Sequence, residues 1–219
     1  MGREGKNLMR RTIIAITAVM ALLVGANTAD AAGGWKIYSY NNSGQALSSK
    51  PAPAGTASIA EFTFSRTPDD ALLAMKASGS SDSSILGKRI TATFAIVGTG
   101  TFTYWGEGTA DNPCGTPANT RLYFNTANGP FAYTKYWWSN PASMILTAPG
   151  GGVVTAMVEP AEWSDWNGQN GATDPDAFAN AASNPDLIGL SFGGGCFFEN
   201  GVGVDPGSAT FKLISYTVE

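Results

Sequence analysis

The most constraining feature of the sequence is a strict alternation of apolar and polar side chains over residues 89–97. The apolar members are Ile90, Ala92, Phe94 and Ile96. In an extended chain these side chains share one face and the threonines between them share the other. In a helix the same residues would be spread around the axis. The segment therefore predicts a β-strand with one face in a core.

Shorter runs of the same kind recur along the chain between turns rich in Gly, Pro and Asn. They predict strands over residues 35–40, 59–65, 72–77, 89–97, 101–105, 121–125, 133–140, 144–146, 153–158, 187–192, 197–204 and 209–218. We expect hairpin turns at Gly98-Thr99-Gly100 and at Asn200-Gly201. A long series of short strands predicts an all-β fold, an antiparallel β-sandwich or jelly roll.

One short helix is expected after Asp174. Asp174 is a favourable N-cap, Pro175 suits the first helical position, and Asp176 favours the positive end of the helix dipole. Alanine-rich residues follow, and Asn184-Pro185 would end the helix.

The first 31 residues have the pattern of a signal peptide. Basic residues precede an uncharged apolar run over residues 12–26, and Ala29-Asp30-Ala31 fits a small-x-small cleavage site. The run is shorter than the roughly 20 apolar residues of a membrane span. Arg10-Arg11 leaves twin-arginine export open beside the Sec route. We predict that residues 32–219 form one exported domain, secreted or periplasmic, with no integral membrane anchor after cleavage.

The charge balance disfavours nucleic acid as a partner. The chain has a formal net charge of −4. The first 31 residues carry four basic and two acidic side chains, so the remainder is at −4 − 4 + 2 = −6. An acidic surface repels phosphate backbones.

The two cysteines, Cys114 and Cys196, are far apart in the sequence. In an oxidising compartment such a pair is most simply a disulfide. Two free buried thiols are the alternative.

The sequence contains no histidine, which excludes a Ser-His-Asp triad and any histidine-ligated metal. The G-x-S-x-G pattern around Ser191 lacks a base, and glycines and more strand follow it. We interpret Ser191 as an ordinary strand residue. We expect no cofactor, because helix capping explains Asp174 and Asp176 more simply than calcium does.

Two aromatic segments hold four of the six tryptophans, over residues 133–141 and 159–168. Rings beside Asn, Asp and Lys suit a surface that stacks on a sugar and hydrogen-bonds around its edge. If residues 133–140 are extended, Trp137 lies on the face of Lys135 and is exposed, whereas Tyr136 and Trp138 are buried. The predicted ligand-binding set is Trp137, Trp163, Trp166, Arg121, Tyr123, Lys135, Asp165 and Asn167.

Several runs resemble a group of exported bacterial proteins of unassigned function. They are residues 121–124 (RLYF), 136–140 (YWWSN), 163–165 (WSD), 167–168 (NG) and 188–198 (IGLSFGGGCFF). The resemblance covers most of the chain from about Gly87 onward. The layout is also similar to galactose-binding-like jelly rolls, the fold of many carbohydrate-binding modules. That similarity implies a carbohydrate ligand and a structural calcium for which the sequence shows no ligand set.

Three functions follow as hypotheses. The first is a non-catalytic exported domain that binds a carbohydrate or similar polymer. The second is a histidine-independent glycan-cleaving enzyme with paired carboxylates such as Glu107, Glu159 or Glu162. The third is a structural or surface-matrix protein.

Overall fold

The computed structural model describes residues 34–39, 46–49, 58–77, 84–126 and 130–219. The predicted signal peptide, residues 1–31, and its boundary with the following domain lie outside these ranges. The helices within these ranges are all too short or too polar to span a bilayer.

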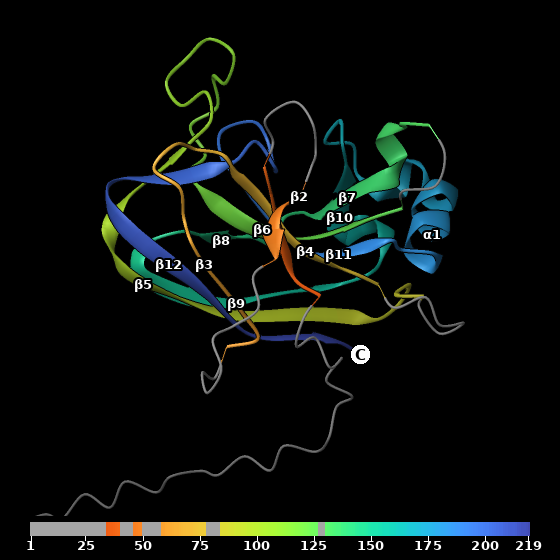
Figure 1. Cartoon of the computed structure of the whole chain (residues 1–219). Coiled ribbons are helices and arrows are strands. Elements are labelled where there is room, and N and C mark those ends of the chain that lie inside the picture. The colour runs from red at the N-terminus through yellow and green to blue at the C-terminus, as the bar shows by residue number, and fades with distance from the viewer. Residues whose placement is uncertain (1–33, 40–45, 50–57, 78–83, 127–129) are drawn as a thin grey trace, which may run out of the picture.

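Antiparallel β-strands make up most of the described structure (Figure 1). They are β1 (Lys36–Ser39), β2 (Ala46–Ser49), β3 (Ala60–Thr63), β4 (Asp70–Lys76), β5 (Arg89–Tyr104), β6 (Asn119–Asn125), β7 (Tyr136–Ser139), β8 (Met144–Ile145), β9 (Ala148–Met157), β10 (Trp163–Asp165), β11 (Leu187–Gly193) and β12 (Val202–Val218). The helical elements are α1 (Pro175–Ser183) and the 3-10 turns η1 (Tyr133–Lys135), η2 (Pro160–Glu162) and η3 (Gly171–Thr173). The predicted class, all-β and antiparallel with one short helix, is confirmed.

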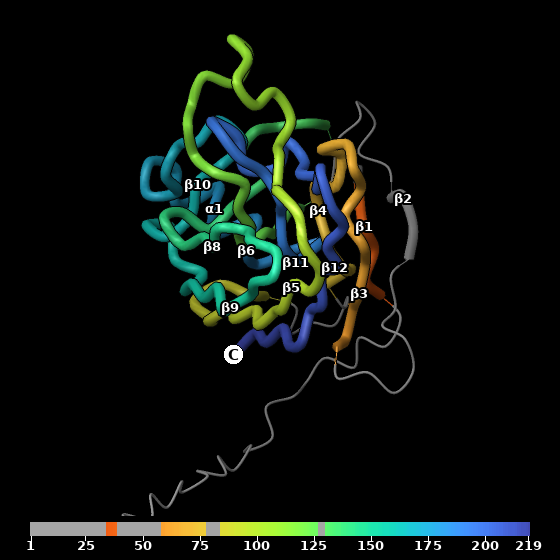
Figure 2. The backbone as a smooth tube through the Cα atoms, turned by 90° about the vertical axis from the view of Figure 1, so that its left-hand side faces the viewer, coloured from red at the N-terminus to blue at the C-terminus, as the bar shows by residue number. Residues whose placement is uncertain are grey.

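The strands pair in the order β10-β7-β6-β11-β4-β12-β5-β9, and the sheet curls over on itself (Figures 1 and 2). Strands β4 and β12 share only the register pair Asp70 and Val202, so the sheet folds there into two layers. The core lies between the layers. Phe192 of β11 packs on Phe62 of β3 and Phe211 of β12, with ring centroids 5.7 and 5.3 Å apart. The result is a β-sandwich.

The hairpin expected at Gly98-Thr99-Gly100 is wrong, because β5 runs through these residues without a turn. The glycines instead allow the backbone of β5 to come close to the backbone of β12. Gly98 has a φ of +110°, and a Cβ there would collide with the carbonyl oxygen of Ser208. The Gly-Thr-Gly sequence that predicted a turn therefore lies in an irregular stretch of one long strand.

The hairpin expected at Asn200-Gly201 is also wrong. Residues 194–201 form a loop between β11 and β12. The Asn200 amide closes this loop from within: its Oδ1 accepts from the Gly194 N–H at 2.9 Å, and its Nδ2 donates to the Trp105 carbonyl at 2.9 Å. Side-chain hydrogen bonds here replace the turn.

The predicted helix is present as α1. Asp174 is its N-cap, and the Asp174 Oδ1 accepts from the Ala177 N–H at 3.1 Å. The helix buries Phe178 against Trp137, with ring centroids 5.0 Å apart. It closes one end of the core beside η1.

The layer that contains β6, β7 and β11 is packed on both faces. Its inner face carries Leu122 and Trp137 in the main core, and its outer face carries Tyr123 and Trp138 in a second cluster. The second cluster also includes Leu72 and Ala74, with Tyr38, Tyr136, Trp166, Leu187 and Phe198 packed against it. This outer face is the foundation of the candidate site.

Candidate functional site

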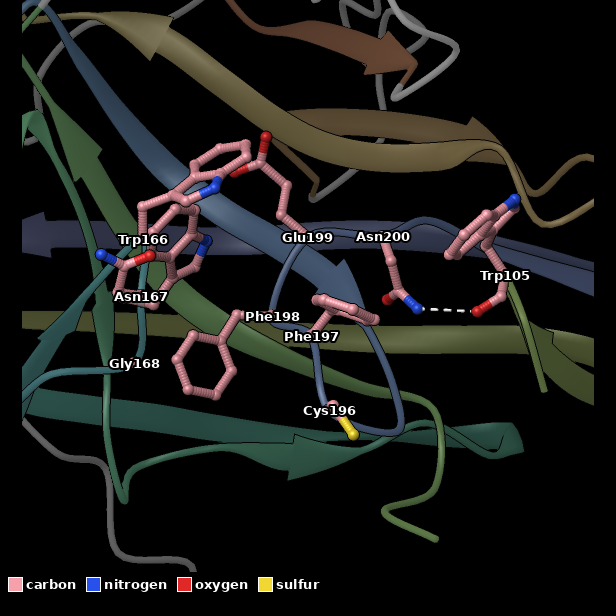
Figure 3. A pocket seen from close by; sticks show the side chains of 10 residues that line it. Trp105, Trp166, Asn167, Gly168, Cys196, Phe197, Phe198, Glu199 and Asn200 are labelled. Carbon is pink, nitrogen blue, oxygen red and sulfur yellow. Dashed lines mark hydrogen bonds between the residues drawn. The ribbon is translucent and has the colours of Figure 1, made fainter. Parts of the chain in front are cut away.

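A pocket of about 480 Å³ opens beside the second cluster (Figure 3). Its lining residues come from the start of the 105–114 loop, β7, the turn after β10 and the 194–201 loop. They are Trp105, Trp138, Trp166, Asn167, Gly168, Cys196, Phe197, Phe198, Glu199 and Asn200.

Aromatic rings line the pocket from its floor to its rim. Trp138 is buried, and its ring centroid lies 5.7 Å from that of Trp166 and 6.0 Å from that of Phe198. Trp105 and Phe197 form an edge-to-face pair at 6.5 Å, and they are 46% and 44% exposed. The rim therefore offers ring faces to a ligand, while the floor is fixed by packing.

Exposed rings continue beyond the pocket on the Trp166 side. The Phe131 ring is 5.6 Å from Trp166 and 5.3 Å from Tyr133, and both Phe131 and Tyr133 are exposed. Tyr136 lies 5.4 Å from Trp166. Trp166 thus joins the pocket to an outer aromatic surface.

Glu199 is the only acidic side chain among the lining residues. The residue is half-buried, but its Oε2 is fully buried and has no hydrogen-bond partner among the described residues. Burial raises the pKa of Glu199 from about 4.5 to about 8, and the neighbouring Trp138 indole lowers it in part. The Trp138 Nε1 itself makes no hydrogen bond of good geometry within the described residues.

Asn112 pins the 194–201 loop to the 105–114 loop. Its Oδ1 accepts from the Cys196 N–H at 2.7 Å, and its Nδ2 donates to the carbonyls of Trp105 and Gly194 at 3.0 and 3.2 Å. The fit requires glycine at position 195, because a Cβ there would collide with the Asn112 amide and φ is +66°. The glycine before Cys196 therefore allows the Asn112 side chain to come close to the backbone of the 194–201 loop.

A disulfide joins the same two loops, as predicted. Cys114 and Cys196 are bonded, with Cα atoms 5.0 Å apart and a separation of 82 residues. Cys196 lines the pocket, and Phe197, Phe198 and Glu199 follow it directly. The bond thus anchors the segment that supplies half of the lining residues.

Two of the predicted binding tryptophans lie in the main core. Trp137 is 1% exposed and Trp163 is 0% exposed. Their indole N–H groups donate to the carbonyls of Thr134 and Met157 at 2.8 and 2.7 Å. The expected exposure of Trp137 is wrong because Lys135 belongs to η1 and does not mark a wet strand face.

Arg121 and Tyr123 of the predicted binding set lie on the outer face, but both are covered. The Arg121 Nη1 donates to the Ser139 carbonyl at 2.8 Å, and its Cζ lies 4.5 Å from the centre of the Phe198 ring. Desolvation lowers the pKa of Arg121 to about 10. These side chains support the pocket floor and are not among its lining residues.

The remaining residues of the predicted binding set are either structural or line the pocket. The Lys135 Nζ donates to the Pro130 carbonyl at 2.7 Å. Asp165 is buried, and its Oδ1 accepts from the N–H groups of Asn167 and Gln169, both at 2.9 Å. Asp165 therefore shapes the turn, and Trp166 and Asn167 on that turn line the pocket.

The predicted set omits Trp105, Trp138, Phe197, Phe198, Glu199 and Asn200. The positions of the cysteines could have identified three of these residues. Trp105 precedes Cys114 by nine residues and Phe197-Phe198 follow Cys196, so the predicted disulfide brings these rings toward each other. Nothing local in the sequence marks Glu199.

The site offers stacking surfaces, one carboxyl group and two primary amides. Within the described ranges, no cluster of three or more Asp, Glu or Cys side chains is placed to hold a metal ion. Ser191, in the G-x-S-x-G pattern, is fully buried within β11, as expected of a strand residue.

Comparison with known proteins adds one distant likeness. No protein-family model matches the sequence, and no curated protein matches it. Among solved structures, the chain is similar to a xylan-binding module, CBM15. The two are 13% identical, the match covers 86% of this chain and 95% of that chain, and the TM-score is 0.43. A likeness this distant establishes neither a family nor a ligand.

Proposed function

We propose that the protein is a non-catalytic binding domain for a carbohydrate or similar polymer. The observation that carries this proposal is the pocket, where exposed and half-buried rings surround a single carboxyl group. The apolar face of a sugar ring stacks on indole and phenyl rings, and its hydroxyl groups bond to amides and carboxyls. Trp105, Trp166, Phe197 and Phe198 supply the rings, and Asn167 and Glu199 supply the polar groups.

A chain of several sugars fits the surface better than a lone monosaccharide. The exposed rings of Phe131 and Tyr133 lie outside the pocket but adjoin Trp166. A ligand that filled the pocket and extended over Trp166 would reach them. We propose that these rings form an outer subsite.

Binding is favoured over hydrolysis because the pocket lining contains one carboxylate. The paired mechanism needs two, about 5 to 10 Å apart. One of the predicted carboxylates has a structural hydrogen bond instead, because Glu162 Oε2 accepts from the Met157 N–H at 2.8 Å. Asp165, from the predicted binding set, holds its own turn. The export predicted from the signal peptide completes the proposal, and a disulfide is consistent with an oxidising compartment.

Truncation of the pocket rings tests the proposal. Trp105→Ala and Trp166→Ala should each weaken binding to a responsive polysaccharide by about tenfold or more, because each removes a stacking face. Affinity electrophoresis over a polysaccharide panel, followed by calorimetry, measures this.

Ile145→Ala is the matched control. Ile145 is an exposed apolar residue of β8 outside the pocket lining, so its loss should leave binding unchanged. If the wild-type protein ignores every polysaccharide, or if the three variants behave alike, the proposal is wrong.

A further inference from the structure

One oxygen of the Glu199 carboxyl group is unpaired within an aromatic enclosure. The Glu199 Oε2 is buried without a hydrogen-bond partner among the described residues, and the rings of Trp138, Trp166 and Phe198 line the same pocket. A buried carboxyl group without a partner is costly unless a ligand supplies the partner. The question is therefore which chemical group completes it.

Among the residues that the structure describes, no cation pairs with Glu199. No Lys or Arg side chain is among the lining residues. Arg121, which underlies the pocket wall, donates to the Ser139 carbonyl and stacks on Phe198. The ion pairs found in the described structure involve other residues. A cationic group of a ligand could therefore pair with Glu199.

We propose that the pocket selects saccharides that carry a protonated amine, such as unacetylated hexosamines, with Glu199 as the counter-ion. This inference rests on the proposed carbohydrate binding and names the class of sugar. The ammonium group would pair with the Glu199 carboxylate in a region of low dielectric. The negative faces of the surrounding rings would add cation–π attraction.

The protonation of Glu199 gives the inference a second observable consequence. Because burial raises the pKa of Glu199 to about 8, its carboxyl group is mostly protonated at neutral pH in the free protein. An ammonium ligand favours the carboxylate, so binding releases a proton from Glu199. A neutral sugar leaves that proton in place.

The other charged or titratable groups near Glu199 do not reproduce this signature. Burial raises the pKa of the hydroxyl groups of Tyr38, Tyr123 and Tyr136, so they stay protonated at neutral pH. Arg121 stays charged there, since desolvation lowers its pKa only to about 10. Lys36 and Lys76, on the outer face of the same layer, are exposed and lie on β1 and β4.

The experiment compares three β-1,4-linked hexamers that differ in one substituent: glucosamine, N-acetylglucosamine and glucose. Calorimetry at about pH 5.5, where both the sugar amines and Glu199 carry their protons, should show the glucosamine hexamer bound about tenfold or more tightly than the other two. Titrations in two buffers of different ionisation enthalpy should show proton release with that hexamer alone.

Two variants separate the inference from the general binding proposal. Glu199→Gln keeps the side-chain shape but cannot ionise, so it should abolish both the preference and the proton release while leaving the weaker binding of neutral hexamers. Asp176→Asn removes an exposed carboxylate from the first turn of α1 and should change neither.

The outcomes are distinct. Equal affinity for all three hexamers in the wild-type protein overturns the amine preference and leaves the carbohydrate proposal standing. A preference that survives in Glu199→Gln overturns the role of Glu199. If none of the hexamers nor any polysaccharide binds, the carbohydrate proposal itself fails and the inference fails with it.

Discussion

At the scale of single residues, Glu199 links the pocket to the stability of the fold. In the folded protein its carboxyl group keeps its proton up to about pH 8, whereas the unfolded chain releases it near the ordinary value of about 4.5. Between these two values the folded state binds more protons than the unfolded state. The free energy of unfolding therefore falls as the pH rises, because the unfolded chain is stabilised by losing a proton that the folded state retains.

We expect the free energy of unfolding to fall as the pH is raised from about 4.5 to about 8, on account of Glu199. The expected loss is on the order of 1–3 kcal/mol, less than the full shift implies because the pocket is open to water. Urea denaturation at several pH values measures it. Glu199→Gln should flatten this dependence, and Asp176→Asn should keep the wild-type slope. Equal slopes in the wild-type protein and Glu199→Gln would contradict the assignment.

Neighbouring tryptophans show what residue-level patterns can and cannot establish. Alternation along a strand correctly places Trp137 and Trp138 on opposite faces. Which face is the core depends on where the strand begins. The strand begins at Tyr136, so the charge of Lys135 gave the wrong answer. Because this layer is packed on both faces, alternation of apolar and polar residues does not distinguish a solvent-exposed face from a buried one.

At the scale of elements, the 194–201 loop determines the pocket. It has no regular secondary structure, and its shape comes from the Asn112 and Asn200 amides, from glycines and from the disulfide. Each of these partners is distant in sequence or depends on a tertiary contact. The helix α1, by contrast, is set by its own capping residues, so local sequence rules predicted it correctly and failed for the loop.

Removal of the disulfide should weaken both the fold and the pocket. Replacement of Cys114 and Cys196 by Ser opens a loop of 82 residues, which costs up to about 4 kcal/mol in the chain-entropy model. Ligand affinity should fall as well, because Phe197, Phe198 and Glu199 lose their covalent anchor. Guanidinium denaturation and calorimetry measure the two effects. An unchanged affinity would show that the Asn112 hydrogen bonds alone hold the loop.

At the scale of the whole molecule, the aromatic core joins the two layers through β12. Phe211 contacts Phe62 and Phe94 of its own layer at 5.6 and 4.9 Å, and it contacts Phe192 of the opposite layer at 5.3 Å. The period-two pattern of each strand predicted such a core. The pairing of strands far apart in sequence, which decides which residues surround the pocket, has no local signature.

Phe211→Ala should destabilise the whole sandwich by about 3–5 kcal/mol, because it leaves a cavity between the layers. Chemical denaturation measures this. Ile214→Ala on the same strand is the control, since Ile214 is among the exposed apolar residues, and it should cost under about 1 kcal/mol. Comparable losses in the two variants would mean that Phe211 does not join the layers.

The position of β12 has a consequence for biosynthesis. β12 is the last described strand in the sequence, yet it lies inside the sheet between β4 and β5 and also pairs with β3. A nascent chain leaves the ribosome or a translocation pore with its N-terminus first. Until β12 emerges, the edges of β3, β4 and β5 that pair with it therefore stay unpaired. Unpaired strand edges of this kind associate with other chains. We expect the sandwich to close only after residues 202–218 have emerged, because β3, β4 and β5 lack their β12 partner until then.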